Sequence, residues 1–136
     1  MAFADPATGR KIVDSGRGTE PQTVTLAEAC KVGDVLGYSS GWKRALATTG
    51  SVIQGRLVAL AAGAIGDEVP VSANPVVDGY TGATPGNYVY VAEGTDNGKI
   101  TETAPTTSGD ANTIIGVALT ATKVMFFLNS RADSTA

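Results

Sequence analysis

The chain has 136 residues, of which 17 are glycine, and its net charge is −3. This length suits one domain with a buried core, and the density of glycine and proline argues against a helical bundle. Without a basic excess we expect no nucleic-acid partner, and the absence of histidine removes the commonest general base and metal ligand.

The first six residues contain neither a basic region nor an apolar core, so we expect no signal peptide. Residues 1–22 mix glycine, proline and charges of both signs, and we expect them to form a flexible N-terminal arm. Within this arm only Lys11, Ile12 and Val13 could pair as a short strand. We expect the arm to be loose or to lie on a partner.

Residues 23–129 are expected to form the domain, followed by a C-terminal tail at 130–136. Thr25 and Glu28 have the spacing of a helix capping box, which is compatible with one helical turn or with an extended loop. Cys30 has no partner for an internal disulfide and is expected to be a small buried apolar residue.

Short β-strands are expected throughout the domain, at 34–38, 42–46, 53–60, 68–71, 75–78, 88–91, 99–103, 114–119 and 123–128. Pro70 cannot donate a ladder hydrogen bond, which predicts an edge strand or a bulge there. Asn97 and Gly98 suit a type I′ hairpin turn. The spacing of the strands predicts an all-β fold, a small compact β-barrel or β-sandwich-like domain with an extended N-terminal arm.

A faint internal repeat runs through these strands. Gly33–Tyr38 is similar to Gly86–Val91, and Val58–Leu60 with Glu68–Val71 is similar to Val117–Leu119 with Lys123–Phe126. Two similar β-units closing one domain would explain this pattern. Glycine-rich hairpins that look alike by chance would explain it as well.

Catalytic groups do not converge in the sequence. No histidine can activate a hydroxyl, and the adjacent carboxylates Asp67 and Glu68 would point to opposite faces of a strand unless a turn bends them. We therefore expect no enzyme activity, no cofactor and no small-molecule substrate. The longest apolar stretch, 57–65, is too short to span a bilayer, so we expect no membrane partner.

Two features could bind a macromolecule. Trp42 lies beside Lys43 and Arg44, a combination found in binding hot spots, although a single tryptophan can also fill a small core. Residues 124–128 are apolar at every position, so both faces of that strand must be covered. The face that carries Phe127 would then meet a second sheet or a neighbouring subunit.

The sequence resembles a known family over about residues 25–128, on the segments 26–42, 58–60, 79–83, 86–90 and 115–119. It is similar to the small head decoration proteins of tailed phages, also called capsid cement or stabilising proteins. The resemblance implies a non-enzymatic virion protein on the outer surface of the capsid, assembled in the host cytoplasm. It also implies binding to the major capsid protein, a homotrimer, and an N-terminal arm that adds a strand to the capsid protein.

From this resemblance and the residue patterns we expect capsid or subunit contacts at Lys11, Ile12, Val13, Trp42 and Phe127. The alternative function is a carbohydrate- or surface-binding β-module of a phage fibre or cell envelope. In that case Trp42, Tyr80, Tyr88 and Tyr90 would line one face. A small enzyme domain of the β-clip kind would need a pocket with a perturbed acid.

Overall fold

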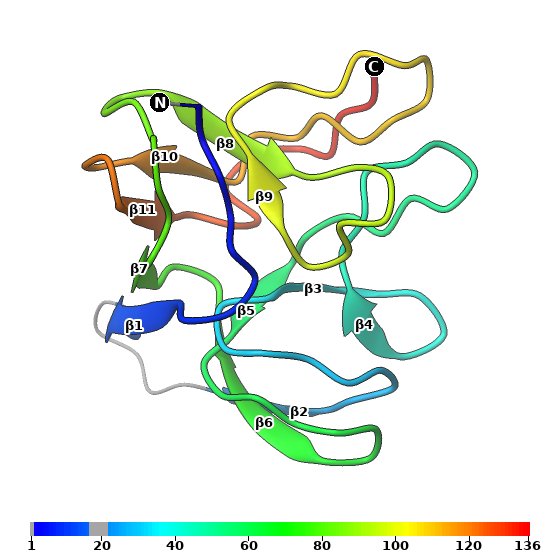
Figure 1. Cartoon of the computed structure of the whole chain (residues 1–136). Coiled ribbons are helices and arrows are strands. Elements are labelled where there is room, and N and C mark those ends of the chain that lie inside the picture. Colours follow the sequence, from blue (N-terminus) through cyan, green and yellow to red (C-terminus); the bar gives the residue numbers. More distant parts are fainter. Residues whose placement is uncertain (1, 17–21) are drawn as a thin grey trace.

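The structure is a computed structural model that describes residues 2–16 and 22–136. Its described residues form eleven strands and no helix, arranged as two antiparallel sheets that pack against each other (Figure 1). The predicted all-β class is confirmed. The two sheets form a sandwich-like domain, and the strands do not close into a barrel.

The first sheet has five strands in the order β2–β6–β5–β3–β4. Its strands are β2 (Gln22–Thr25), β3 (Val35–Tyr38), β4 (Trp42–Arg44), β5 (Leu57–Ala59) and β6 (Glu68–Ser72). A parallel bridge between Leu26 and Trp42 joins the end of β2 to β4, at the opposite edge of the sheet. The sheet therefore curls around a small apolar cluster, formed by Leu26, Cys30, Leu36, Ala59, Val69 and Val71.

The second sheet has six strands in the order β1–β7–β11–β10–β8–β9. Its strands are β1 (Lys11–Asp14), β7 (Val76–Asp78), β8 (Tyr88–Val91), β9 (Ile100–Thr101), β10 (Gly116–Ala118) and β11 (Lys123–Phe126). In β8 the two valines are buried and the two tyrosines face outward, as the alternation in the sequence predicts. The buried side of this sheet supplies much of the larger core, which also contains Val35 and Val58 from the first sheet.

The internal repeat of the sequence corresponds to a repeat in the structure. Apart from β1, the two sheets have the same strand order, because β7, β8, β9, β10 and β11 take the places of β2, β3, β4, β5 and β6. The backbone contacts repeat as well: the N–H of Ala59 donates to the carbonyl of Asp34, and that of Ala118 donates to the carbonyl of Asn87, both at 2.9 Å. The chain therefore contains two similar β-units in tandem, the first repeat (β2–β6) and the second repeat (β7–β11).

The strand register also corrects one detail of the repeat. Val71 pairs with Ala59, whereas Val124 pairs with Ala118, so Val71 and Val124 are equivalent. The similarity in sequence instead aligned Val71 with Phe126. The error arises because the loops before β6 and β11 differ in length. In addition, apolar residues recur at every second position of a strand, so the two strands still look similar when one is shifted by two residues.

Pro70 lies in an inner strand, so the predicted edge strand or bulge is wrong. Strand β6 pairs with β2 on one side and with β5 on the other, and no bulge interrupts the pairing with β2. The carbonyl of Pro70 accepts from the N–H of Leu60 at 2.9 Å, one residue beyond the end of β5. The edge of Pro70 that lacks an N–H therefore faces Leu60, just past the end of β5. The missing N–H thus removes no hydrogen bond from the β5–β6 ladder.

The structure decides two local predictions, the helical turn after Thr25 and the type of the turn at Asn97 and Gly98. The Thr25–Glu28 pattern forms no helix, because the Glu28 carboxylate accepts from the backbone N–H and the Nε of Arg44, each at 3.0 Å. The predicted hairpin between β8 and β9 is present, but its turn is not type I′. Gly98 has a φ of 81° whereas Asn97 does not have a positive φ, and type I′ requires both.

The N-terminal segment differs from the loose arm that the sequence predicts. Ala4 donates to Thr81 at 2.8 Å, β1 pairs with β7, and the ring of Phe3 stacks on Tyr80 with 5.8 Å between centroids. Residues 2–16 thus lie against the domain, and Gln22, the last residue of the predicted arm, begins β2, while residues 1 and 17–21 lie outside the described residues.

The predicted C-terminal tail is also in contact with the domain. Thr135 bridges to Ala111, and the carboxylate of Asp133 pairs with the guanidinium of Arg56. All residues of the tail remain exposed. The tail therefore lies on the surface and adds little to the core.

A buried ion-pair cluster holds the N-terminal segment in place. Arg10 is only 4% exposed, and its guanidinium contacts the carboxylates of Asp5 and Asp34 and donates to the carbonyls of Gly33 and Ala7 at 3.2 and 2.9 Å. The Asp5 carboxylate also accepts from the N–H of Ile100 at 3.1 Å. Burial raises the pKa of Asp5, although Arg10 and the amide donors act to lower it.

Replacing Arg10 tests this anchor. We expect Arg10→Met to lower the free energy of unfolding by about 3–5 kcal/mol, because two buried carboxylates lose their counter-charge. Urea unfolding followed by circular dichroism measures the change. The matched control is Arg56→Met, which breaks the exposed pair with Asp133 and should cost no more than about 1 kcal/mol. Similar losses in the two variants would contradict the anchor.

Candidate interaction surfaces

The three predicted contact residues of the N-terminal segment lie on β1, the outermost strand of the six-stranded sheet. Val13 is 53% exposed, Lys11 is also exposed, and Ile12 packs partly against the larger core. An irregularity interrupts the pairing with β7 between Ile12 and Asp14. The outer edge of β1 has no strand partner among the described residues, so it presents a short backbone edge.

Trp42 lies opposite Tyr38 in the β3–β4 hairpin. One side of Trp42 packs against the smaller apolar cluster, and its ring meets that of Tyr38 edge to face, with 5.4 Å between centroids. Tyr38 is 65% exposed. Trp42 thus fills part of the core and at the same time supports the exposed side chain of Tyr38, which no pattern in the sequence indicated as a contact residue.

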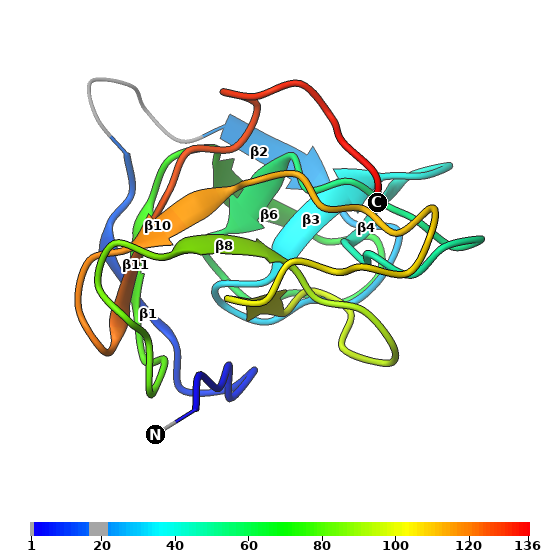
Figure 2. The ribbon, with the colours of Figure 1, turned by 90° about the horizontal axis from the view of Figure 1, so that it is seen from above.

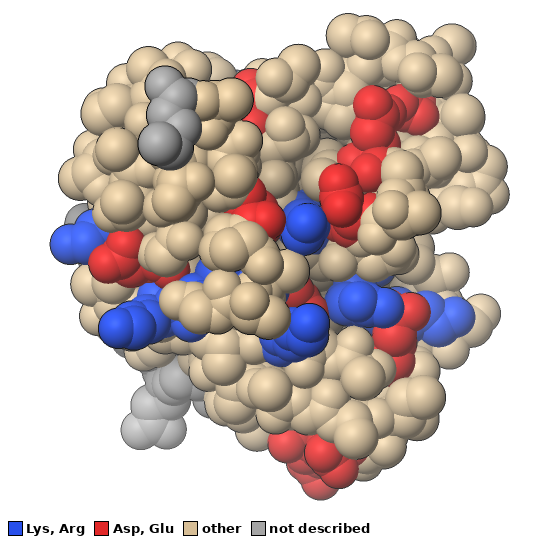
Figure 3. Space-filling model, in the orientation of Figure 1, with Lys and Arg blue, Asp and Glu red and all other residues tan. Residues whose placement is uncertain are grey.

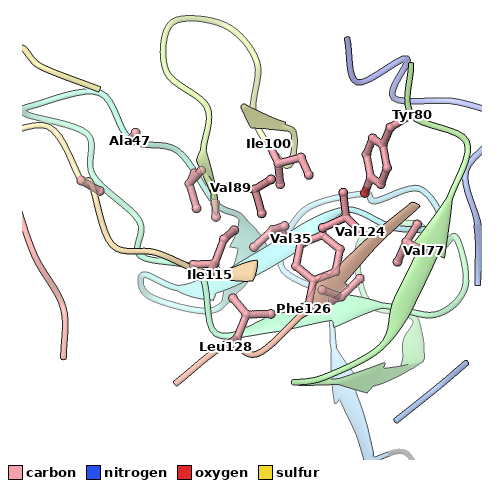
Figure 4. Close-up of a cluster of buried hydrophobic side chains, with 14 residues drawn as sticks. Val35, Ala47, Val77, Tyr80, Val89, Ile100, Ile115, Val124, Phe126 and Leu128 are labelled. Atoms are coloured by element: carbon pink, nitrogen blue, oxygen red, sulfur yellow. The ribbon is translucent and has the colours of Figure 1, made fainter. Parts of the chain in front are cut away.

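Phe127 lies on the outer side of the six-stranded sheet. Val124, Phe126 and Leu128 point into the larger core (Figure 4), whereas Met125 and Phe127 are half-buried on the opposite side. The first sheet contributes to the core on the Val124 side. The outer side is therefore not covered by the second layer of the sandwich.

The five predicted contact residues do not form one patch. Strand β1 and the β3–β4 hairpin lie at opposite ends of the molecule, in both views of the ribbon (Figures 1 and 2). The aromatic residues expected for a sugar-binding face do not share a face either. Tyr80 is 1% exposed and stacks on Phe3, whereas Tyr88 and Tyr90 point outward from β8 in the second sheet and Trp42 belongs to the first.

Charged side chains are unevenly distributed over the surface. In Figure 3 the Lys and Arg residues form a band across the middle, and Asp and Glu gather at the upper right and at the bottom. The upper left of this view shows no charge among the described residues. A hollow of about 430 Å³ opens between the N-terminal segment and the β8–β9 hairpin.

A pair of carboxyl groups lies near this hollow and was missed in the sequence. Glu93 lines the hollow, and a hydrogen bond to the neighbouring Asp110 raises the pKa of Glu93. Asp110 is buried and accepts from the N–H of Thr49 at 2.7 Å. The two residues are far apart in the sequence, so no local pattern could reveal them. Asp67, by contrast, accepts from the N–H of Ala64 at 2.9 Å in an exposed turn, which favours the solvated turn over a catalytic dyad.

Among the described residues no group of three or more cysteine, aspartate or glutamate side chains is placed to hold a metal ion. None of the described segments is a helix long and apolar enough to cross a bilayer. No protein-family model, no curated protein and no solved structure matches the chain.

Cys30 is expected to be unreactive in the folded protein. It is 5% exposed, its Sγ lies 3.6 Å from the carbonyl of Ala61, and burial together with Asp34 raises the pKa of the thiol. We expect labelling by a maleimide to be at least on the order of a hundredfold slower in buffer than in urea. The control is Ile65→Cys in a Cys30→Ser background, because position 65 is exposed and should react at the unfolded rate. Equal rates for the two thiols would show that Cys30 is accessible.

Proposed function

We propose that the protein is a structural virion component that binds the outside of a tailed-phage capsid and bridges neighbouring subunits of the major capsid protein. One observation carries the proposal: two exposed contact features lie at opposite ends of one domain (Figures 1 and 2). One is the outer edge of β1 with Val13, and the other is Tyr38 supported by Trp42. Contacts at separate ends suit a protein that joins two neighbours.

The strand edge supports this function because it is already ordered. The buried Arg10 cluster fixes the segment that leads into β1, so a partner would not have to order it. An edge strand offers backbone donors and acceptors to an extended segment of another chain. This differs from the N-terminal arm that the resemblance implies, since the chain would offer its edge instead of extending an arm.

The aromatic end supports binding in a different way. Exposed tyrosine held by tryptophan is the type of side-chain pair that contributes most to protein interfaces. Two weak contacts per molecule suffice on a capsid, because the lattice repeats the partner and avidity multiplies the affinities. The homotrimer and the position on the outer capsid surface stay predictions from the family resemblance, as does the absence of catalytic activity.

The test is co-sedimentation with heads of the virus that encodes the protein. We expect the protein to pellet with the heads at a fixed ratio to the major capsid protein. Tyr38→Ala should weaken binding by about tenfold or more, because it removes an exposed hot-spot ring without opening the core. Ile65→Ala is the matched control, since Ile65 is an equally exposed apolar residue outside both contact features.

Two outcomes would overturn the proposal. The first is failure of the wild-type protein to bind heads of that virus. The second is binding to a carbohydrate array with none to the heads, which would favour the alternative of a sugar-binding module.

A further inference from the structure

Three acidic side chains line the hollow between the N-terminal segment and the β8–β9 hairpin, and two of them already have a counter-charge. The carboxylate of Asp5 pairs with the guanidinium of Arg10, and that of Asp96 lies 3.4 Å from the Nζ of Lys99. The third, Glu93, is exposed and forms no ion pair among the described residues. The hollow therefore carries one acidic group that the described part of the chain does not neutralise.

Asp110 lies beside Glu93 as a fixed acceptor that is only partly satisfied. It is 1% exposed, its Oδ1 accepts from the N–H of Thr49 at 2.7 Å, and its own N–H donates to the carbonyl of Thr107 at 2.9 Å. The other oxygen, Oδ2, is buried and has no hydrogen-bond donor among the described residues. A hydrogen bond to Asp110 raises the pKa of Glu93, since two acids share the site. A ligand that is positively charged and donates hydrogen bonds would satisfy both groups.

The size and lining of the hollow favour an organic cation over a metal ion. No group of three or more acidic or cysteine side chains is placed to hold a metal in the part of the chain that the structure describes. The hollow measures about 430 Å³, which is enough room for a whole side chain. Long basic side chains bury their aliphatic stem on apolar surface and keep the charged head among polar groups. Apolar side chains for such a stem are present in the lining: Phe3, Ala92, Ile100, Ala104 and Pro105.

Two carboxylates side by side suit a guanidinium better than an ammonium group. A guanidinium is planar and presents five N–H donors, so one group can serve two carboxylates at once, whereas an ammonium is a compact point charge. The core of this chain contains such an arrangement, because the guanidinium of Arg10 contacts the carboxylates of both Asp5 and Asp34. The pair at the hollow offers the same two acceptors without the arginine.

We propose that the hollow binds an arginine side chain of the major capsid protein, with the guanidinium between the carboxylates of Glu93 and Asp110. The identity of the partner rests on the proposed capsid binding, and the contact is a third one, separate from the β1 edge and from Tyr38. Because Glu93 is exposed, its side chain can turn to admit the guanidinium. A single such ion pair is weak, and the repeated capsid lattice multiplies it.

Titration of the protein with acetyl-arginine amide, followed through the backbone NMR signals of Glu93 and Asp110, tests the site without any capsid component. We expect saturable shifts with a dissociation constant on the order of 1–10 mM. Acetyl-citrulline amide, which has a similar shape but no charge, should give none. Glu93→Gln should weaken binding of the arginine probe by about tenfold or more, because it removes one charge and its amide can donate to Asp110. The matched control Glu68→Gln removes the same charge from an exposed position of the first sheet and should leave binding unchanged.

Two results of the titration would overturn the site. The first is the lack of a saturable shift with the arginine probe, or a shift that Glu93→Gln leaves intact. The second is a shift with calcium chloride and none with the arginine probe, which would indicate a metal site.

Co-sedimentation with heads of the virus then tests the source of the guanidinium. Glu93→Gln should weaken binding to the heads by about fivefold or more, whereas Glu68→Gln should not. If the probe binds but Glu93→Gln pellets with the heads as the wild type does, the capsid protein does not supply the arginine and the proposal is wrong. Failure of the wild-type protein to bind heads would overturn the proposed function, while the titration still reports on the hollow, so the two failures are distinguishable.

Discussion

The guanidinium of Arg10 is the interaction on which the arrangement of the chain depends. A buried arginine is tolerated only when counter-charges and acceptors surround it, and here they come from two parts of the chain. Asp5 belongs to the N-terminal segment and also receives the N–H of Ile100 in the second repeat, whereas Asp34 precedes β3 in the first repeat. The carboxylates that pair with Arg10 therefore connect the N-terminal segment with the first repeat directly and with the second repeat through Asp5, whereas the Nε of Arg10 has no hydrogen-bond partner among the described residues. This connection helps to hold β1 at the edge of the second sheet.

The same cluster shows where the two repeats have diverged. Gly33 and Gly86 are equivalent, and both have a positive φ, of 84° and 89°. A Cβ at Gly33 would lie 3.0 Å from the Arg10 side chain, whereas a Cβ at Gly86 would meet nothing within 4 Å. The residue that follows is Asp34 in one repeat and Asn87 in the other. The backbone turn is thus shared, and only the first repeat has the charge and the close contact that hold the N-terminal segment.

Local patterns predicted the strands other than β2, because alternation and turn residues act over a few positions. The β8 strand, the β3–β4 hairpin and the repeat all follow from such patterns. The packing of the N-terminal segment could not be predicted in this way. From the sequence alone Arg10 would be assigned to the solvent-exposed surface, because its pairing with Asp5 and Asp34 exists only in the folded structure. Among the predicted contact residues, Lys11, Ile12 and Val13 came from a strand signal and Trp42 from composition, and their contacts with a partner stay predictions. The exposure of Tyr38 was not predicted, since which side of a strand is covered depends on the packing of the two sheets.

When two similar β-units pack in tandem, two sheet sides are left without a partner. Each unit has an inner and an outer side, and packing the outer side of the first on the inner side of the second leaves one inner and one outer side without a partner. The free inner side is that of the first repeat, and Leu26 and Cys30 of the same chain pack against it. No further sheet of the described residues packs on the free outer side, where Val117 and Met125 are apolar instead of charged. In repeat proteins the terminal units that face solvent have polar outer faces. The outer side of the second repeat departs from this rule, because apolar residues lie on it.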